Sequence, residues 1–574
     1  MRETKLKLAI LAGPDSAATR MCVSAIAANP SIQVVAILSE SRFVSLKQRI
    51  RNLRRNVKRE GWRYLYDWML RTIQQTLDRM ACSPSPSTEV KALLRQAFPG
   101  RAFSLIDFER LYGIPTQQFK NLNSPEAAEA LRSLDADLGI VLGTRVLRPS
   151  TFSVPRMGCL NLHKGKVPDY RGLPPGFWEL YDGKDSAGVT VHFVDAGLDT
   201  GDVVGEGAVS IHPRDTPTTL RRKLDVLGSE LLVRCVADLA EGGAVRRPQP
   251  PSALKARTKP TRRERQALNG RLGAMAVPEP SLSLIFKTAY YLAIFYSGFY
   301  DITRAWRKLT GANRTCILLY HRVNDLADDV LTTSVERFAE HLVALRKYYP
   351  VVSTSSLIET LRSDRKVLSS SVVIHFDDCY RDVYTQASPL LVEAGFPACS
   401  FISSGFVDSD RVFQHDAENC PFSLQNLRSP ELRGLISRGI EIGAHTVNHV
   451  DLGRCSVADA TNELHQSKSD LEKILGCPVP LFSYPYGREQ NIRPEIVPLV
   501  REIGYEAMFS AHGGFVSHKS NLFDIPRVGM SGQFRPLDLL MEIEGFSFGA
   551  MRLRWASKKR NGMKTTQKEF VRSV

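Results

Sequence analysis

Two blocks of alternating strand-like and helical segments constrain the fold of this chain more than any other feature. The first block starts with KLAILAG and IQVVAILSE, two apolar runs joined by a stretch that Asp15 or Ser16 can cap as a helix. The second block starts at TCILLYHRV and continues through SVVIHF, PACSFISS and IEIGAH. Because one hydrophobic core could not hold 574 residues, the alternation predicts two α/β domains with largely parallel sheets.

The composition along the chain sets the expected boundaries. A stretch rich in proline and basic residues separates the two blocks, and the chain ends in a basic tail. We therefore expect a first domain over 1–250, a basic linker with an apolar helix over 251–312, a second domain over 313–550 and a tail over 551–574. Within the first domain, residues 43–85 are helical in pattern, basic and aromatic, which is typical of an insertion.

The charge and the cysteines limit the kinds of partner and compartment. The net charge of +16 and the pI of about 9.4 favour acidic partners, such as phosphorylated substrates or anionic lipid. No aromatic-rich basic motif typical of nucleic-acid binding accompanies this charge, so nucleic acid is not an expected partner. The 10 cysteines are scattered singly without a CxxC pair, which is typical of a reducing cytosol and predicts a cytoplasmic protein.

One apolar segment leaves two interpretations open. Residues 282–302 are interrupted by Lys287, and the uninterrupted part is shorter than a membrane-spanning helix. The segment can lie on the inner face of a membrane between its basic flanks, as a peripheral contact. It can equally be a helix that docks on a neighbouring domain.

Paired carboxylates and paired histidines in the second block indicate a metal hydrolase. Asp377 and Asp378 follow the apolar run SVVIHF, at the kind of strand end where parallel α/β folds place catalytic groups. His445 and His449 are spaced so that a helical turn would bring both imidazoles to one side. Two imidazoles and one carboxylate form a divalent metal site with room for water, and the second carboxylate can act as a base. Taken alone, each pair would be an ordinary turn or surface feature.

Residues 313 to about 545 resemble the polysaccharide deacetylase family, carbohydrate esterase family four. The motifs LLYHRV, HFDDCYRD, AHTVNH and FSYPYG occur in the order of that family. The resemblance implies a distorted (β/α) barrel that hydrolyses an N-acyl amide, such as N-acetyl, on a sugar. It also implies that Tyr486 lines the substrate groove. The remaining roles that it implies are Asp377 as the base, and Asp378, His445 and His449 as ligands of zinc or a similar divalent metal.

Three features depart from the pattern of that family. Cys379 replaces the usual glycine after the two aspartates and puts a thiol beside the metal site, and Ser483 replaces the arginine that usually orients the base. No counterpart of the general-acid histidine is evident; His415 and His512 are the candidates, and either can be an ordinary loop residue. These departures keep open a non-catalytic sugar-binding module as the alternative.

A second polar cluster lies in the first block, in GCLNLHKGKVPDYRG. Asn161 and His163 alternate with leucines, so on a strand both polar side chains face the same way. The stretch AGLDTGD adds Asp199 in a glycine-rich turn. An amide that stabilises an oxyanion, an imidazole that moves a proton and a carboxylate that orients the imidazole suit the attack of an amine on an activated acyl group. Singly, these residues would be ordinary strand-edge and turn residues.

Residues 5 to about 250 resemble the formyltransferase family, which includes glycinamide ribonucleotide, methionyl-tRNA and nucleotide-sugar formyltransferases. The stretches DLGIVLGTRVL, GCLNLHKGKVPDYRG and GVTVHFVDAGLDTGDVV carry the resemblance. It implies a doubly wound α/β sheet and formyltetrahydrofolate as the formyl donor. It implies that Asn161, His163 and Asp199 are catalytic. The folate would contact two loops, one at Gly143, Arg145 and Leu147 and the other at Gly197 and Gly201.

The acceptor side of this site differs from the family pattern. The stretch HKGKVP stands where the family more often has HPSLLP. Lys164 and Lys166 add positive charge there, and we expect Lys166 to contact a phosphate of the acceptor substrate.

Both expected sites act on amines or N-acyl amines. The sequence therefore predicts a multifunctional enzyme of carbohydrate metabolism that acts on an amino sugar or nucleotide sugar in cell-surface polysaccharide synthesis. Removal of an N-acetyl group followed by formylation, and formylation followed by deformylation, are both open. The alternative is a methionyl-tRNA-type formyltransferase joined to a non-catalytic sugar-binding module, although the small basic β-barrel usual in that family is not evident after residue 250. The sequence does not define the oligomeric state.

Overall fold

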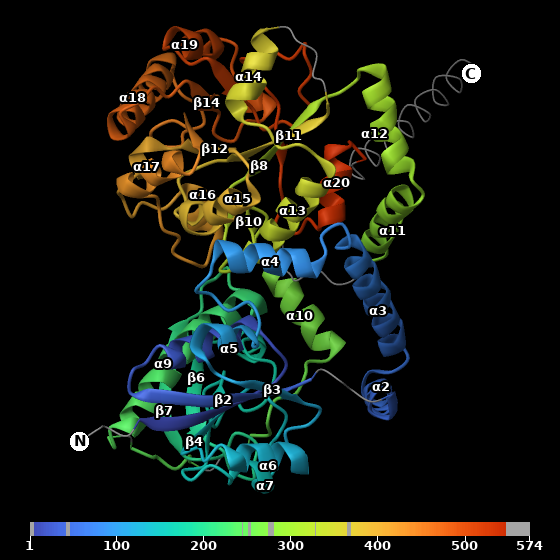
Figure 1. Ribbon diagram of the computed structural model, residues 1–574, viewed down its shortest axis with the longest axis vertical. Helices are drawn as coiled ribbons and strands as arrows, with labels where there is room; N and C mark the ends of the chain where they lie inside the picture. The colour runs from blue at the N-terminus through green and yellow to red at the C-terminus, as the bar shows by residue number, and fades with distance from the viewer. Residues whose placement is uncertain are drawn as a thin grey trace, which may run out of the picture. The chain divides into compact units, whose positions relative to one another are not determined.

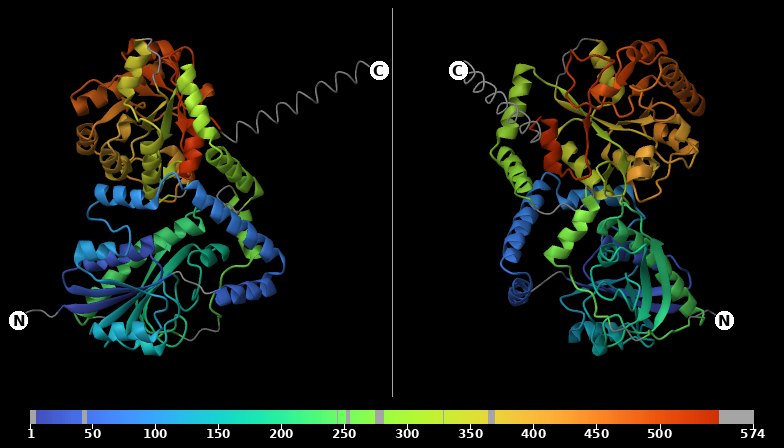
Figure 2. Two further views of the ribbon diagram at one scale, coloured as in Figure 1. Left: turned by 45° about the vertical axis from the view of Figure 1, so that its right-hand side comes forward. Right: turned by 180° about the vertical axis from the view of Figure 1, so that it is seen from behind.

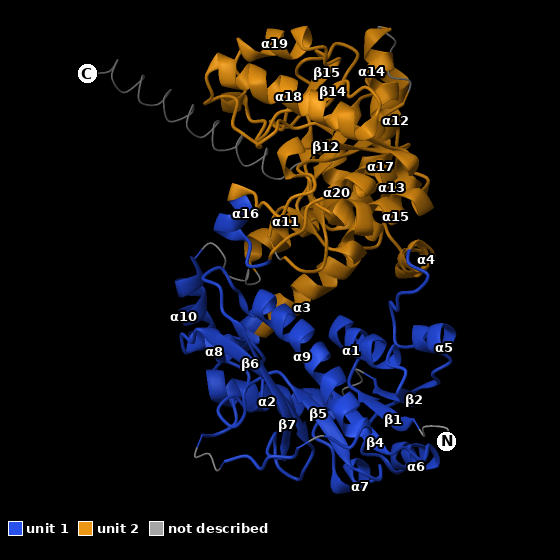
Figure 3. Cartoon of the chain, turned by 90° about the vertical axis from the view of Figure 1, so that its left-hand side faces the viewer, with its two compact units in different colours: residues 1–67, 98–279, 415–422 blue, residues 68–97, 280–414, 423–574 orange. Residues whose placement is uncertain are grey.

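The computed structural model of the chain divides into two compact units, which Figure 3 shows in different colours. Unit 1 comprises residues 1–67, 98–279 and 415–422, and unit 2 comprises residues 68–97, 280–414 and 423–574. The residues that the structure describes are 5–41, 46–243, 245–250, 254–273, 281–327, 329–363 and 369–546. The expected basic tail over 551–574 lies outside the described residues.

A 7-stranded sheet forms the centre of unit 1. Its strand order is β3-β2-β1-β4-β5-β6-β7; the strands up to β5 run parallel to one another, and β6 is antiparallel to both of its neighbours. This is the doubly wound α/β sheet that the sequence predicts. The strands are β1 (Leu6–Ala12), β2 (Ile32–Glu40), β3 (Thr116–Phe119), β4 (Leu138–Leu142), β5 (Cys159–His163), β6 (Ser186–Phe193) and β7 (Val203–Ser210).

Helices cover both faces of this sheet. Alternate residues of β1 belong to two separate apolar cores, because successive side chains of a strand point to opposite faces. One core includes residues of α1 (Ala17–Ala27) and α9 (Pro217–Ala240), and the other includes residues of α6 (Pro125–Ser133). The side chain of Ser16 caps α1 as the sequence predicts, since its hydroxyl accepts a hydrogen bond from the Thr19 N–H.

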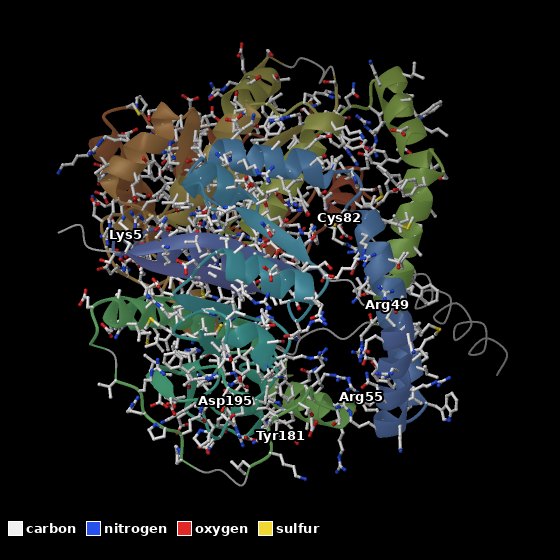
Figure 4. All side chains as sticks on the ribbon, turned by 60° about the horizontal axis from the view of Figure 1, so that its bottom comes forward. Lys5, Arg49, Arg55, Cys82, Tyr181 and Asp195 are labelled. Atoms are coloured by element: carbon white, nitrogen blue, oxygen red, sulfur yellow. The ribbon has the colours of Figure 1, made fainter. Side chains whose placement is uncertain are left out.

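The basic and aromatic insertion is helical, as predicted, and is divided between the two units. It forms α2 (Leu46–Glu60) and α3 (Arg63–Ala81), and α4 (Ser87–Ala97) and α5 (Asp107–Tyr112) follow it before β3. Figure 4 labels Arg49 and Arg55, two of the basic residues of α2. The later part of the insertion, from Trp68, and the following α4 belong to unit 2, where α4 packs on α13 (Val335–Tyr348) and α15 (Ser388–Ala394). The expected first domain therefore gives up part of its chain to the second unit.

Much of the expected linker is an integral part of unit 1. The Arg257 N–H donates a hydrogen bond to the Arg171 carbonyl at 2.7 Å. Further along, α10 (Arg262–Leu272) packs its apolar side chains against α8 (Phe177–Tyr181). Unit 1 thus extends beyond the boundary expected at residue 250, and this extension bears on the site described below.

Unit 2 is built on an all-parallel 7-stranded sheet, curled into a half-barrel (Figure 1). Its order is β15-β14-β13-β12-β11-β8-β16, in agreement with the predicted distorted barrel. β8 and β11 are buried throughout, which explains their uninterrupted apolar sequences. The strands are β8 (Thr315–Tyr320), β11 (Ser371–Phe376), β12 (Ala398–Ile402), β13 (Ile440–Ala444), β14 (Leu481–Ser483), β15 (Ala507–Phe509) and β16 (Val528–Gly529).

From β8 onward, helices alternate with the strands of unit 2 along the chain. They are α13 (Val335–Tyr348), α14 (Thr354–Arg362), α15 (Ser388–Ala394), α17 (Ser429–Ser437), α18 (Val457–Leu475), α19 (Ile496–Glu502) and α20 (Pro536–Ile543).

The apolar segment over 282–302 forms parts of two helices in unit 2 (Figure 2). α11 (Leu282–Tyr296) docks on α20, and its Lys287 Nζ lies 3.2 Å from Asp538 Oδ1. α12 (Phe299–Thr310) follows after a bend of 58°. Among the described helices no single one is long and apolar enough to cross a membrane, whereas this bent pair passes that test when the two are taken together. Of the two interpretations of this segment, docking on a neighbouring element explains why one face of α11 is buried, since that face lies against α20.

A close approach of two loops in unit 1 depends on Gly13. Its N–H donates to the Leu142 carbonyl at 2.9 Å, and a Cβ at this position would lie 2.0 Å from the Gly143 carbonyl oxygen. We predict that Gly13→Ala forces the loops after β1 and β4 apart and lowers the stability of unit 1 by about 1–3 kcal/mol. Scanning calorimetry measures this as a fall in the melting temperature of unit 1. Gly100→Ala is the control, because nothing lies within 4 Å of that Cβ; an equal effect in both variants would contradict the prediction.

Candidate active sites

A cavity of about 560 Å³ in unit 1 lies where β1, β4 and β5 end. Its lining includes Ser16 after β1, Gly143 after β4 and the turn after β6 that contains Asp195, labelled in Figure 4. Residues 257–259, which follow the expected domain boundary, also line it. The cavity therefore uses the usual ligand-binding edge of a parallel sheet, completed by a segment from beyond residue 250.

Asn161, His163 and Asp199 meet in this cavity. The Asn161 side-chain amide donates to Asp199 Oδ1 at 3.4 Å, and His163 Nδ1 lies 3.4 Å from Asp199 Oδ2. The Gly172 N–H donates to the same Oδ2 at 3.1 Å and holds the carboxylate in place. Asp199 itself has a φ of 55°, a left-handed conformation that is strained for a residue other than glycine. The structure thus brings together the amide, the imidazole and the carboxylate that the sequence singled out.

The environment of His163 favours a neutral ring that can still accept a proton. Burial lowers the pKa of His163 below its ordinary 6.5, although Asp199 and the Tyr170 carbonyl act in the opposite direction. Nε2 lies 2.7 Å from the Tyr170 carbonyl oxygen, and Nδ1 faces Asp199. Once protonated, both ring N–H groups would therefore have an acceptor.

The carboxylate of Asp199 is held in its ionised form. Burial alone would raise its pKa, but the His192 and His163 rings, whenever they carry a proton toward the carboxylate, and the Gly172 N–H hold the pKa below its usual value. An anion at this position can stabilise an imidazolium that forms during reaction.

His192 on β6 is a site residue that the sequence analysis missed. It pairs across the sheet with Asn161, and its Nε2 lies 3.1 Å from Asn161 Nδ2. Its Nδ1 lies 2.8 Å from the Phe193 carbonyl, so Nδ1 carries the proton and Nε2 accepts from the amide. One hydrogen of Asn161 is thereby fixed, and the other makes only the long bond to Asp199. The only signal in the sequence was the alternation of VTVHF, which also fits a core histidine.

Of the residues expected to contact a folate, four line the cavity and one does not. Gly143, Arg145, Leu147 and Gly197 line the cavity, whereas Gly201 is not among its lining residues. A Cβ at Gly201 would lie 2.0 Å from the Phe193 carbonyl oxygen, so this glycine permits a close approach of two backbone segments.

The two lysines of HKGKVP also differ in position. Lys164 lines the cavity and forms an ion pair with Asp225. Lys166 is exposed and is not among the lining residues. Lys164 is therefore the nearer of the two to any ligand in this cavity, while the expected contact of Lys166 with a phosphate stays a prediction.

Asp378, His445 and His449 form a cluster in unit 2 that fits a divalent metal. One carboxylate oxygen and one nitrogen from each ring all lie within 4.8 Å of one another. Asp378 Oδ1 is 3.7 Å from His445 Nε2 and 3.1 Å from His449 Nε2. Two imidazoles and a carboxylate are a donor set that zinc accepts while other positions stay open. Asp378 follows β11 and His445 follows β13, so both stand at the carboxyl edge of the sheet.

The segment that holds both histidines is not a helical turn, contrary to what their spacing suggested. It is an irregular loop in which Thr446 has a φ of 63° and His449 a φ of 54°. Glu463 fixes it by accepting hydrogen bonds from the N–H groups of Val447 and Asn448, at 2.8 and 2.9 Å. The rings still meet, with centroids 5.0 Å apart, because the left-handed residues turn the chain back on itself.

Asp377 has an arginine partner that its own motif does not supply. The Arg527 guanidinium donates to both carboxylate oxygens at 2.7 Å, and the Ser483 hydroxyl donates to Oδ2 at 3.2 Å. Burial alone would raise the pKa of Asp377, but Arg527 and, less strongly, His445 hold it below the ordinary value. The expectation that Asp377 lacks an orienting arginine is therefore wrong: Arg527 occupies that role from 150 residues further along the chain.

A backbone carbonyl determines which nitrogen of His445 carries the proton, and burial determines the protonation state of Cys379. His445 Nδ1 lies 2.7 Å from the Ser483 carbonyl, so Nδ1 carries the proton and Nε2 faces Asp378. The Cys379 side chain is fully buried, and burial raises the pKa of its thiol to about 12. Cys379 is not part of the ligand cluster, and its thiol stays protonated at neutral pH.

Tyr486 and the two candidate general-acid histidines occupy three different settings. Tyr486 is 45% exposed, and its ring lies 5.0 Å from that of His449. His512 follows β15 at the same edge of the sheet, next to Ala511, whose N–H donates to the Gly487 carbonyl. His512 Nε2 is 2.9 Å from Asp524 Oδ1. His415 falls in the short segment assigned to unit 1.

Comparison with protein families identifies both units. A family model described as formyl transferase matches residues 73–236, and a model described as polysaccharide deacetylase matches residues 364–508. The chain joins a formyltransferase domain to a polysaccharide deacetylase domain. Both are enzyme families, and the formyltransferase family implies a formyltetrahydrofolate donor.

The curated relatives match the formyltransferase domain. A methionyl-tRNA formyltransferase of Thermosynechococcus vestitus is 39% identical over 145 residues, which are 25% of this chain and 42% of the relative. One from Geobacter metallireducens is 35% identical over 139 residues, 24% of this chain and 45% of the relative. The chain thus spans less than half the length of the curated relatives it matches.

Solved structures resemble each domain in turn. A Streptococcus pyogenes deacetylase in complex with acetate has a TM-score of 0.35 and 22% identity, and covers 40% of this chain and 98% of its own. Glycinamide ribonucleotide transformylase 1 from Symbiobacterium toebii has a TM-score of 0.29 and 18% identity, and the match covers 43% of this chain and 95% of that protein's chain.

The buried pair of Asp377 and Arg527 gives a prediction for the deacetylase domain. Arg527→Met leaves Asp377 buried without a counterion, so we expect a loss of stability of about 3–5 kcal/mol. Scanning calorimetry follows the melting temperature of this domain. The double variant Asp377→Asn, Arg527→Met should recover part of the loss, because no unpaired charge remains.

Arg362 offers a matched control for this experiment. It forms an ion pair with Glu506 at 2.8 Å in which both side chains are about half exposed. Arg362→Met should leave the melting temperature nearly unchanged, because exposed pairs contribute little. A similar small effect for Arg527→Met would show that the buried pair does not stabilise the domain.

Proposed function

We propose that the chain is a bifunctional enzyme that acts on amino sugars. Its formyltransferase domain transfers a formyl group from formyltetrahydrofolate to the amine of a sugar or nucleotide sugar, and its deacetylase domain hydrolyses the N-acetyl amide of a sugar. The observation that carries this proposal is that one chain holds both a converging amide, imidazole and carboxylate set and a ligand cluster beside an oriented carboxylate.

In the formyltransferase domain, the cavity residues supply proton transfer and charge stabilisation. Formyltetrahydrofolate, when bound, supplies the activated formyl group. The second amide hydrogen of Asn161, held only by a 3.4 Å bond, is free to turn to the oxygen of the formyl group as negative charge develops on it. The neutral His163 ring accepts a proton from the attacking amine. Asp199 then stabilises the imidazolium, which gives its proton to the folate nitrogen as the bond between that nitrogen and the formyl carbon breaks.

In the deacetylase domain, Asp377 acts as the base. A divalent cation, which we propose to be zinc held by Asp378, His445 and His449, supplies polarisation of the amide carbonyl and a more acidic water when bound. Asp377 would accept a proton from the attacking water and could return it to the sugar nitrogen as the C–N bond breaks, and Arg527 fixes the direction of its carboxylate. The exposed ring of Tyr486 offers an apolar face on which a sugar can pack.

The two reactions fit consecutive steps on one substrate. Hydrolysis of an N-acetyl amide leaves a free amine, and a free amine is what the formyltransferase domain consumes. Lys164, which lines the cavity and is paired with Asp225, can turn from that carboxylate to a phosphate of a phosphorylated or nucleotide-linked sugar.

Methionyl-tRNA is the second candidate for the acceptor, because the curated relatives are methionyl-tRNA formyltransferases. Their similarity covers less than half of each relative, and it leaves the acceptor to be tested. In this alternative the deacetylase domain would bind a sugar without hydrolysing it.

Substrate assays with paired variants test the proposed function. Incubation of amino-sugar and nucleotide-sugar mixtures with formyltetrahydrofolate should add one formyl group to an amino sugar, detected by mass spectrometry. We expect His163→Ala to reduce this transfer by at least about 100-fold and to leave acetate release from an N-acetyl sugar intact. Asp378→Asn should do the reverse, and it keeps a side chain that tolerates the φ of 78° at this position. Formylation of methionyl-tRNA but of no amino sugar would overturn the proposal.

The buried imidazole gives a pH dependence for formyl transfer. Because burial lowers the pKa of His163 from 6.5, kcat/KM should fall only as the pH drops below 6.5 and the ring becomes charged. In Asp199→Asn this acid limb should move to still lower pH, because the carboxylate raises the pKa of the ring. A limb that arises from the acceptor amine would stay at the same pH in both enzymes, and that result would argue against His163 as the proton acceptor.

A further inference from the structure

The helix α12 presents large apolar side chains to solvent along one face. Their spacing of three, four and three residues places them in one stripe of the helix. Exposure is high at all four positions: Phe299 51%, Ile302 63%, Trp306 66% and Leu309 83%. We call these residues the α12 stripe. It extends beyond the apolar segment over 282–302 that the sequence analysis singled out.

The opposite face fixes this orientation. Tyr300 is fully buried, and its hydroxyl lies 2.7 Å from that of Tyr349. Arg304 donates to the Tyr348 carbonyl, and Arg307 forms an ion pair with Glu544. The polar and aromatic face of α12 is therefore packed against unit 2, so the apolar stripe must face outward. An amphipathic helix of a water-exposed surface would be turned the other way.

The stripe continues onto the preceding helix. On α11, Leu282 is 49% exposed and Phe286 is 63% exposed. Figures 1 and 2 show α11 and α12 following one another along one side of unit 2. Exposed apolar side chains gathered on one side of a domain mark an interaction surface.

The charges near the stripe indicate an anionic partner. On α12 itself the exposed Lys308 is offset by the exposed Asp301, so the positive charge comes mainly from the tail. The last described residue of the chain, Phe546, packs its ring 5.9 Å from that of Phe299, so the C-terminal tail leaves the described part of the chain beside α12. The sequence of that tail contains Arg552, Arg554, Lys558, Lys559, Arg560, Lys564, Lys568 and Arg572 against the single acid Glu569.

We propose that the α12 stripe inserts into the surface of an anionic lipid membrane, with the basic C-terminal tail as the second, electrostatic anchor. Apolar and aromatic side chains enter the boundary between headgroups and acyl chains, where tryptophan is favoured. Neighbouring cations are attracted to anionic headgroups. Apolar insertion and electrostatic attraction together give stable peripheral binding, whereas either of them alone gives only marginal binding. This proposal does not depend on either enzymatic activity.

Vesicle flotation of the full chain tests the proposal. The protein should float with phosphatidylcholine vesicles that contain phosphatidylglycerol and bind pure phosphatidylcholine vesicles far less. The variant Ile302→Glu, Trp306→Glu should lower the partition coefficient for the anionic vesicles by about tenfold or more. Val392→Glu is the matched control, because Val392 on α15 is 52% exposed and lies outside the stripe; it should bind as the wild type does. Equal melting temperatures of the three proteins exclude a folding defect.

Two further measurements separate the stripe from the tail. Brominated lipids should quench a part of the tryptophan fluorescence that disappears in Trp306→Phe. Reversal of three tail charges, in Lys558→Glu, Lys559→Glu, Arg560→Glu, should weaken binding to anionic vesicles and leave the small binding to neutral ones unchanged.

Specific results would overturn the proposal. They are absence of flotation of the wild-type protein with anionic vesicles, or equal flotation of the stripe variant. A wild-type dimer that does not float, and that becomes monomeric in the stripe variant, would assign the stripe to a second copy of the chain. In another outcome the wild-type protein is a monomer that does not float, and aqueous quenchers reach Trp306 only after the tail charges are reversed. That result would show that the tail of the same chain covers the α12 stripe.

Discussion

Parallel strands end together at one edge of a sheet, and both candidate active sites of this chain depend on that constraint. In the formyltransferase domain, the loop after β4 and the end of β5 bring Gly143 and His163 to one cavity. In the deacetylase domain, the residues after β11 and β13 bring Asp378 to His445. Side chains that are far apart in sequence meet because their strands end at the same edge of one sheet: β4 and β5 are adjacent, and only β12 lies between β11 and β13. Loops at that edge can then vary without loss of the site.

Burial sets the protonation states in both sites, and in each a neighbouring group decides the outcome. Desolvation favours the neutral form of His163, while Asp199 and the Tyr170 carbonyl lie where they can stabilise the protonated ring. Desolvation would also neutralise Asp377, but the Arg527 guanidinium keeps it ionised and fixes its direction. The same arginine makes Asp377 a weaker base, so orientation is obtained at some cost in basicity.

The sequence was informative where chemistry follows a strand within a few residues, as at Asp377, Asp378, His445 and Asn161. It was uninformative where a partner comes from a segment with no motif. Arg527 lies 150 residues from Asp377 in an ordinary stretch, and its role depends on β16 pairing with β8. His192 resembles a core residue until its pairing with Asn161 is known. The spacing of His445 and His449 is compatible with a helical turn, but spacing does not encode the left-handed residues that the loop uses instead.

The order in which the chain passes through the two units limits how the protein can be divided into fragments. Because residues 68–97 belong to unit 2 and lie between two segments of unit 1, the polypeptide leaves its first unit, returns to it and leaves again. A fragment that starts at residue 313 would lack α4, which covers α13 and α15. A first fragment that ends at residue 312 would in turn lack residues 415–422 of unit 1, so a single cut in the chain does not separate the two units.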